Sequence, residues 1–283
     1  MSDQNVFNGK IVIMTGGASG IGREMALQMA RGGATLVLAD INEEGVRKTA
    51  ADIEAAGGKA QANVVDTTDF NQVEALVDGT VAEHGRLDYI FNNAGIAVGG
   101  EVDKMPIEHW DKIIDINVKG VVYGTSAAYK HMAKQHSGHI VNTASLAGIV
   151  PSPMLSPYST TKFAVVGLCE SLRPEAAQKG VKVTALCPGF IESQIYDNSL
   201  LSGDMAKQGA RATIPVKFVT TEKGSQMLLK GVAANKAIVT LPFYGHLLWR
   251  SYRFNMPLHR RFSVLTSKLA IKRAKKAAKK SGK

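Results

Sequence analysis

Short apolar runs alternate with longer segments of helical spacing along most of the chain. Alternation of this kind is typical of a parallel sheet with helices on both faces. The pattern therefore predicts an α/β fold with a doubly wound parallel sheet of about seven strands. The strands are expected near residues 10–15, 35–40, 60–65, 87–91, 139–145, 182–187 and 237–241.

A glycine-rich segment follows the first predicted strand and precedes a helical pattern at residues 23–31. Glycines at such a turn let a pyrophosphate approach the backbone, and the amides at the start of a helix favour negative charge. An ordinary strand-to-helix turn is the alternative for a glycine cluster taken alone. The residues that we expect to bind a dinucleotide here are Gly16, Ser19, Gly20, Ile21 and Gly22.

The second predicted strand ends in Asp40, about twenty residues after the glycine segment. A carboxylate at this place accepts hydrogen bonds from a ribose diol and repels a 2′-phosphate. Asp40 therefore favours NAD over NADP as the cofactor. A helix N-cap or a turn is the alternative role for this residue.

Ser145, Tyr158 and Lys162 form a candidate proton-transfer unit. If a helix begins near residue 156, Tyr158 and Lys162 lie on one face, one turn apart. A neighbouring ammonium favours the phenolate and is expected to lower the tyrosine pKa, so that the phenol can exchange a proton with an alcohol or alkoxide. The Ser145 hydroxyl could hydrogen-bond the same substrate oxygen. The four-residue spacing of Tyr158 and Lys162, taken alone, is also compatible with the alternative that both lie on a solvated helix face.

The motifs together make the chain resemble the short-chain dehydrogenase/reductase family over about residues 7–242, which implies a Rossmann-type fold. The matching segments are Thr15-Gly16-x-x-x-Gly20-x-Gly22, Asn92-Asn93-Ala94-Gly95, the set Asn117, Ser145, Tyr158 and Lys162, and Pro188-Gly189.

The resemblance also implies a role for each site residue. Tyr158 would be the acid/base, Lys162 would lower the tyrosine pKa and hold the nicotinamide ribose, and Ser145 would polarise the substrate oxygen. Asn117 would hold a proton-relaying water. Asn93 and Asn117 could instead satisfy backbone groups in turns. The remaining cofactor contacts implied are Asp66 at the adenine, Asn93 in the cofactor groove, and Pro188, Gly189, Ile191 and Ser193 near the nicotinamide.

Bulky apolar residues lie in the segments expected to surround the nicotinamide, and core packing is the alternative for about half of them. They predict an oxidoreductase that interconverts a bulky apolar secondary alcohol and a ketone, such as a steroid-, retinoid- or lipid-like molecule. An NADP-dependent carbonyl reductase and a non-catalytic dinucleotide-binding regulator are the alternatives. The residues are Ile96, Val98, Leu146, Met154, Leu155, Phe190, Ile195, Tyr196 and Met205.

The cysteines, the histidines and the amino terminus indicate the redox compartment, the absence of a metal site and the localisation that we expect. Cys169 and Cys187, the only cysteines, lie in apolar segments and predict buried thiols in a reducing compartment. No metal site is expected, and His131, His136 and His139 are interpreted as a solvated helix end. The short polar amino terminus predicts no signal peptide, so we expect a cytoplasmic protein.

The carboxyl-terminal segment 243–283 is interpreted as a basic amphipathic extension of the catalytic domain 1–242. No acid follows Glu222, and residues 223–283 carry 15 of the 34 Lys/Arg, which leaves 19 Lys/Arg and all 24 acids before them. The ending resembles the hydroxysteroid- and retinol-dehydrogenase-like branches of the family. Its apolar stripe is Leu258, Phe262, Leu265 and Leu269.

Three interpretations of this extension remain open. It could lie peripherally on an anionic membrane surface, or it could pack on the body or on a second subunit. Nucleic-acid binding is the third interpretation, but no specific recognition motif accompanies the lysines of this segment. The predicted helices near 108–135 and 156–179 pair across two-fold axes in the resembling family, so a homodimer or homotetramer is expected.

Overall fold

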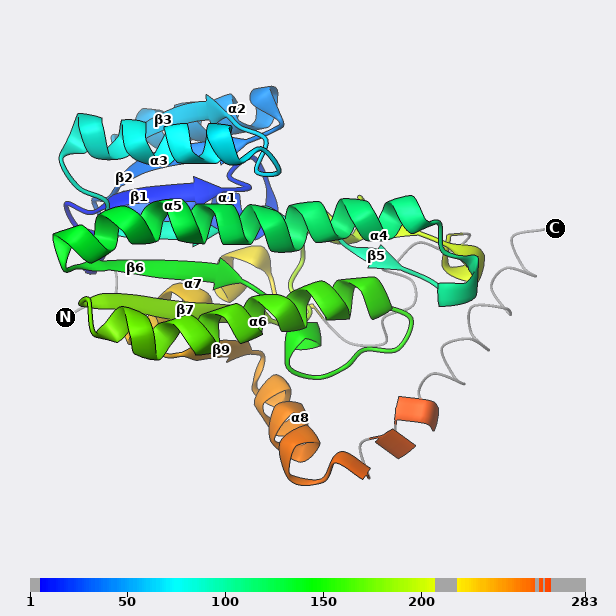
Figure 1. Cartoon of the computed structure of the whole chain (residues 1–283). Coiled ribbons are helices and arrows are strands. Elements are labelled where there is room, and N and C mark those ends of the chain that lie inside the picture. Colours follow the sequence, from blue (N-terminus) through cyan, green and yellow to red (C-terminus); the bar gives the residue numbers. More distant parts are fainter. Residues whose placement is uncertain (1–5, 207–217, 258–259, 262, 266–283) are drawn as a thin grey trace.

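Seven parallel strands form the central sheet of the computed structural model, which describes residues 6–206, 218–257, 260–261 and 263–265. The strand order β3-β2-β1-β4-β6-β7-β9 reverses direction between β1 and β4 (Figure 1). Ligands bind beyond the carboxyl ends of the strands at such a reversal. The predicted Rossmann-type sheet is thus confirmed. Its strands are β1 Ile11–Thr15, β2 Thr35–Asp40, β3 Lys59–Val64, β4 Tyr89–Asn92, β6 Gly138–Thr143, β7 Val181–Pro188 and β9 Ile238–Leu241.

Helices cover both faces of the sheet (Figure 1). One face holds α1 Gly20–Arg31, α2 Glu43–Ala55 and α7 Thr221–Ala233. The other holds α3 Phe70–His84, α5 Gly120–Gln135 and α6 Ser156–Ala177. The helix α4 Ile107–Ile114 runs through a π-helical turn, Asp115–Lys119, directly into α5.

Two very short strands form a second, separate sheet that the sequence pattern did not predict. They are β5 Val98–Gly99 and β8 Leu200–Leu201, and they pair in parallel. The sheet joins two segments about a hundred residues apart, both beyond the carboxyl ends of the central strands. It therefore closes one side of the crevice.

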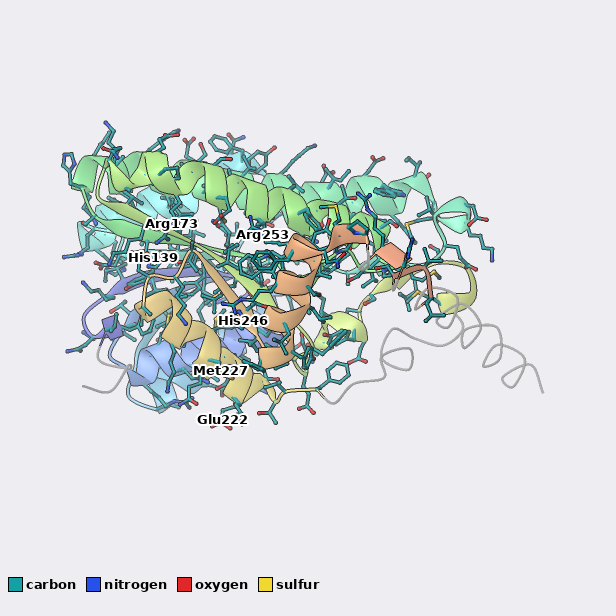
Figure 2. All side chains as sticks on the ribbon, turned by 90° about the horizontal axis from the view of Figure 1, so that it is seen from below. His139, Arg173, Glu222, Met227, His246 and Arg253 are labelled. Carbon is teal, nitrogen blue, oxygen red and sulfur yellow. The ribbon has the colours of Figure 1, made fainter. Side chains whose placement is uncertain are left out.

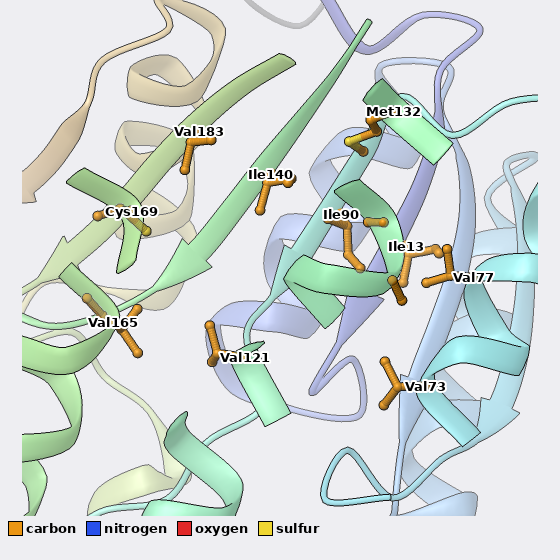
Figure 3. Packing of buried hydrophobic residues seen from close by; sticks show 14 of the residues in the cluster. Ile13, Val73, Val77, Ile90, Val121, Met132, Ile140, Val165, Cys169 and Val183 are labelled. Atoms are coloured by element: carbon orange, nitrogen blue, oxygen red, sulfur yellow. The ribbon is translucent and has the colours of Figure 1, made fainter. Parts of the chain in front are cut away.

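A continuous apolar layer lies between the central strands and the helices α3, α5 and α6 (Figure 3). Because helices cover both faces, the strands are buried on both sides, which explains their unbroken apolar runs. Cys169 lies in this layer, and burial raises the pKa of its thiol to about 12. Cys187 in β7 is likewise buried, and both thiols are free. The prediction that both thiols are buried is confirmed. Residues that form the layer include Ile13, Val73, Ile90, Val121, Met132, Ile140, Val165 and Val183.

The helix α8, Phe243–Phe254, follows the edge strand β9 and projects away from the sheet (Figure 1). Leu248, Trp249 and Tyr252 pack it against the core. Of the predicted stripe farther along, only Leu265 belongs to the described residues, and Leu258, Phe262 and Leu269 lie outside them. In the described ranges, none of the helices is both long and apolar enough to cross a bilayer.

His139 is buried in β6, which corrects the prediction that it belongs to a solvated helix end (Figure 2). Its Nε2 lies 2.8 Å from Thr184 Oγ1, and that hydroxyl donates to the carbonyl of Lys236 at 2.7 Å. The Thr184 hydroxyl proton is therefore taken up by the Lys236 carbonyl. The Thr184 oxygen must accept the hydrogen bond with His139, so Nε2 carries the imidazole proton and donates it. Burial, with the positive charges of Lys182 and Arg173, lowers the pKa of His139 to about 3.

This buried imidazole predicts a loss of stability in acid. Between pH 6.5 and 3 the unfolded chain binds a proton that folded His139 does not, so stability present above pH 6.5 is lost as the pH falls. The free energy of unfolding should drop by about 2 kcal/mol between pH 7 and pH 5 from this group alone. Urea denaturation of His139→Gln should show a smaller drop, whereas the exposed control His246→Gln should match the parent protein. Equal drops in all three would contradict this account.

Candidate active site

A cavity of about 920 Å³ lies at the carboxyl ends of the strands, across the point where the strand order reverses. The glycine segment, the end of β2 and the segments after β4, β6 and β7 all contribute to its wall. The structure thus brings together residues that are far apart in the sequence. Every predicted site residue except Asn117 lines it: Gly16, Ser19, Gly20, Ile21, Gly22, Asp40, Asp66, Asn93, Ser145, Tyr158, Lys162, Pro188, Gly189, Ile191 and Ser193.

The glycine segment forms a tight turn at the start of α1. Gly16 has a φ of +66°, which favours glycine. A Cβ on Gly22 would collide with the carbonyl oxygen of Gly16 and the side-chain amide of Asn93. Ser19 is the N-cap of α1 but makes no side-chain capping bond, so it does not occupy the first helical amides. The start of α1 is therefore a suitable anion site.

Three side chains tie together the ends of β1, β4 and β6. Thr15 Oγ1 accepts hydrogen bonds from the amides of Asn93 at 2.9 Å and Ala94 at 3.1 Å. The side-chain amide of Asn93 donates to the Thr15 carbonyl at 3.2 Å, and its Oδ1 accepts from Thr143 Oγ1 at 3.1 Å. Asn93 thus satisfies backbone groups, as the alternative interpretation held, and it also lines the cavity.

Asp40 serves the turn after β2 and also faces the cavity. Its Oδ2 accepts from the Ala18 amide and its Oδ1 from the Asn42 amide, each at 3.0 Å. Asn42, not Asp40, caps α2, by accepting from the Gly45 amide. Each carboxylate oxygen can accept a further hydrogen bond, so Asp40 can still receive a ribose diol.

Asp66 lies just after the end of β3 and holds its own turn in a similar way. Its Oδ1 accepts hydrogen bonds from the amide and the hydroxyl of Thr68 at 2.9 and 2.8 Å.

Ser193 faces the glycine segment from the opposite wall. A Cβ on Gly20 would lie 3.1 Å from Ser193 Oγ. The hydroxyl accepts from the Ile195 amide at 3.2 Å, and Ile191 pairs with Val219 in an isolated bridge. The cavity is therefore narrow between the start of α1 and the segment after β7.

Ser145 and Tyr158 meet at the centre of the cavity wall. Ser145 lies beyond the end of β6 and caps a short helical turn by accepting from the Ala147 amide at 3.1 Å. Its hydroxyl also lies 3.4 Å from the Pro188 carbonyl. Burial raises the pKa of Tyr158, and the hydrogen bond with Ser145 acts in the opposite direction.

The raised pKa of Tyr158 corrects the expectation that a neighbouring ammonium lowers it. Desolvation disfavours the phenolate, and it outweighs the Ser145 hydrogen bond. The ammonium of Lys162 lies 5.6 Å from the centre of the tyrosine ring. The polar partner of Tyr158 in the structure is therefore Ser145 rather than Lys162.

Lys162 is itself buried, one turn after Tyr158 on α6, as the spacing predicted. Its Nζ donates to the Thr143 carbonyl at 2.8 Å. Burial lowers the pKa of Lys162 to about 8. Thr143, which holds both Lys162 and Asn93, is a site residue that was not predicted from the sequence. Its position at the end of the predicted strand was the available signal.

Asn117 lies behind the cavity wall, fully buried in the π-helical turn. Its amide forms a pair of 2.9 Å hydrogen bonds with the backbone of Ile96, and Nδ2 also donates to Thr161 Oγ1 at 3.2 Å. This geometry makes Asn117 a positioning residue for the wall segment that contains Ile96. Its expected role in holding a relay water stays a prediction.

The remaining part of the cavity is mostly apolar, with Ser152, Gln194, Asn198 and Ser199 as its polar lining residues. All nine bulky residues predicted to surround the nicotinamide line it, rather than only half of them. Val98 and Leu201, from the small second sheet, are among the lining residues. Among the described lining residues, those with charged side chains are Asp40, Asp66 and Lys162. This end therefore suits an uncharged apolar molecule.

The residues present fit a nicotinamide dinucleotide. The glycine turn would hold the pyrophosphate, Asp40 the adenosine ribose, and the segment after β7 would lie beside the nicotinamide. When bound, such a cofactor accepts or supplies a hydride. The fold and cavity together define a dinucleotide-binding α/β protein, and Ser145, Tyr158 and Lys162 line the same cavity.

Comparison with known proteins agrees with this class. Residues 10–201 match the family model for short chain dehydrogenases. The chain is 34% identical to the 3-oxoacyl-(acyl-carrier-protein) reductase FabG of Thermotoga maritima over 233 residues, 82% of this chain and 94% of the relative. It is 38% identical to the cyclohexanol dehydrogenase of Acinetobacter sp. over 194 residues, 68% of this chain and 76% of the relative.

Solved structures give the same result. The crystal structure of a short chain dehydrogenase/reductase from Burkholderia phymatum in complex with NAD superposes with a TM-score of 0.82, at 29% identity. The alignment covers 89% of this chain and 95% of that one. The protein belongs to the short-chain dehydrogenase/reductase family and is an oxidoreductase.

Proposed function

We propose that the protein is an NAD-dependent oxidoreductase that interconverts a bulky apolar secondary alcohol and the corresponding ketone. The observation that carries this proposal is the continuity of one cavity. It runs from the glycine turn and Asp40, past Ser145 and Tyr158, into an apolar end. Similarity to a cyclohexanol dehydrogenase supports an apolar cyclic alcohol as the substrate class.

The chain's own residues would handle the proton. The Tyr158 hydroxyl, paired with Ser145, is positioned to give a proton to the substrate oxygen during reduction and to take it back during oxidation. Ser145 would donate a hydrogen bond to the same oxygen. Lys162 supplies a buried positive charge near the tyrosine ring.

The direct test is reduced-nicotinamide absorbance with a panel of cyclic, steroid, retinoid and long-chain secondary alcohols and ketones. We expect turnover with NAD and an apolar member of the panel. An acidic alcohol of similar size should react poorly, because the apolar end offers no charged partner. Turnover only with charged substrates would contradict the proposal, as would binding of the cofactor without turnover of any panel member.

An NADP-dependent reductase is the second candidate, supported by the similarity to FabG. Asp40 supports the first candidate, because a carboxylate at the end of the second strand would repel a 2′-phosphate. Asp40→Asn should lower NAD affinity about tenfold, since hydrogen bonds to a charged acceptor are lost, and should narrow the preference for NAD over NADP. Fluorescence titration with both cofactors measures this change.

The matched control is Asp66→Asn, at the expected adenine contact. It should weaken NAD and NADP binding by a similar factor and leave their ratio unchanged. If the parent protein binds NADP more tightly than NAD, the second candidate replaces the first.

A further inference from the structure

The helix α8 has two opposite apolar faces. Leu248, Trp249 and Tyr252 face inward and pack on the core. On the other side, Phe243, Leu247 and Phe254 are exposed by 75%, 54% and 88%. Their spacing of four and seven residues places them along one line of the helix. An exposed line of bulky apolar side chains on a well-packed helix indicates a surface that another body covers.

Basic side chains border this exposed line. His246, Arg250 and Arg253 recur at spacings of four and three along α8, and all three are exposed. Figure 2 labels His246 and Arg253 along the helix. Arg260 and Arg261 follow in the next described segment and are also exposed. The sequence has no acid after Glu222, so every charged residue of this region is basic.

We propose that α8 is a docking surface for an anionic lipid bilayer and lies along it with Phe243, Leu247 and Phe254 in the headgroup region. An interfacial helix binds by burying its apolar line, and basic residues beside that line add attraction to anionic lipid. Each basic residue near such a surface raises affinity about fivefold. The inner face of α8 remains packed on the core, so docking needs no rearrangement of the catalytic domain.

A second copy of the chain is a poorer fit for this surface. A two-fold contact between two α8 helices would bring Arg250 and Arg253 of each copy together. The segment supplies no acid to pair with them, so the contact would be repulsive. A bilayer provides both the apolar interior and the negative surface that this helix matches.

The buried inner side of α8, opposite the exposed line, lies next to the cavity wall. A Cβ on Gly245 would lie 3.5 Å from Leu146 Cδ1, and Leu146 lines the cavity. One residue therefore separates the helix from the apolar end of the candidate active site. An apolar substrate dissolved in a membrane would meet the enzyme near the bilayer.

The test is flotation of the full-length protein with vesicles of phosphatidylcholine, with and without phosphatidylglycerol. We expect binding to the anionic vesicles only, weakened as salt is raised. The double variant Phe243→Ser/Leu247→Ser should bind at least about tenfold more weakly, because two large apolar groups are no longer buried. Arg250→Glu/Arg261→Glu should weaken binding by at least the same factor, because attraction becomes repulsion.

Two matched controls and a mass measurement complete the test. Val102, also 54% exposed, lies away from α8, and Val102→Ser should bind as the parent does. Lys48→Glu, an exposed charge reversal on α2, should change binding little. Unchanged binding by Phe243→Ser/Leu247→Ser would overturn the proposal in favour of a purely electrostatic contact. If that variant instead lowers the mass found by light scattering, a second copy covers α8, and the proposal fails. Neither readout depends on turnover.

Discussion

Replacing Tyr158 by phenylalanine is expected to reduce turnover by about a thousandfold, within the range of a general acid/base contribution. The substitution removes only the hydroxyl that pairs with Ser145 and keeps the ring in place. Dinucleotide binding should remain close to that of the parent protein, because the glycine turn and Asp40 are untouched. Steady-state rates and a cofactor titration on the same preparation measure the two effects separately.

Tyr244→Phe is the matched control for Tyr158→Phe. Tyr244 does not line the cavity, and its hydroxyl is buried with no hydrogen-bond partner among the described residues. Removing an unpaired buried hydroxyl is close to neutral for stability, so turnover should be unchanged. Full turnover by Tyr158→Phe, or an equal loss in both variants, would mean that the Tyr158 hydroxyl does not move the proton.

Local sequence signals predicted the architecture and most of the site. The strand-to-helix turn at Gly16–Gly22 and the four-residue spacing of Tyr158 and Lys162 depend on the conformation of a few consecutive residues. Strand alternation then placed the ends of β1, β2, β4, β6 and β7 at one edge of the sheet. Most of the cavity wall follows from those two facts, since side chains beyond parallel strand ends meet there.

Features that depend on tertiary contacts were not predictable in this way. The small sheet pairs Val98–Gly99 with Leu200–Leu201, and two-residue strands have no periodicity to detect. His139 looked like part of a solvated helix end, but it is buried in β6 among groups from β7 and the segment before β9. The pKa of Tyr158 depends on how much protein surrounds the phenol, and sequence spacing does not contain that quantity.

Lys162 illustrates the conflict between stability and function at this site. Burial lowers the pKa of its ammonium from 10.5 to about 8. Below pH 8 the folded protein therefore holds a charge that the unfolded chain solvates better, at a cost of about 3 kcal/mol. Active sites often retain such unfavourable groups because the reaction needs them.

Lys162→Met should therefore raise the free energy of unfolding by about 2 kcal/mol at pH 7. The gain is smaller than the full cost because the Thr143 carbonyl loses its donor. Between pH 8 and 10.5 the folded parent protein releases its proton before the unfolded chain does, so its stability rises relative to the variant. The difference should nearly vanish by about pH 9.5. Urea denaturation at both pH values measures it.

The same variant should lose turnover by about a hundredfold, because the positive charge beside Tyr158 is removed. Lys134→Met, at an exposed position on α5, is the matched control and should change neither stability nor turnover. A destabilised Lys162→Met protein at pH 7 would show that the ammonium stabilises the fold, and the cost assigned to its burial would be wrong. A stabilised variant with full turnover would remove Lys162 from the proton-transfer unit and leave Tyr158 and Ser145 to move the proton alone.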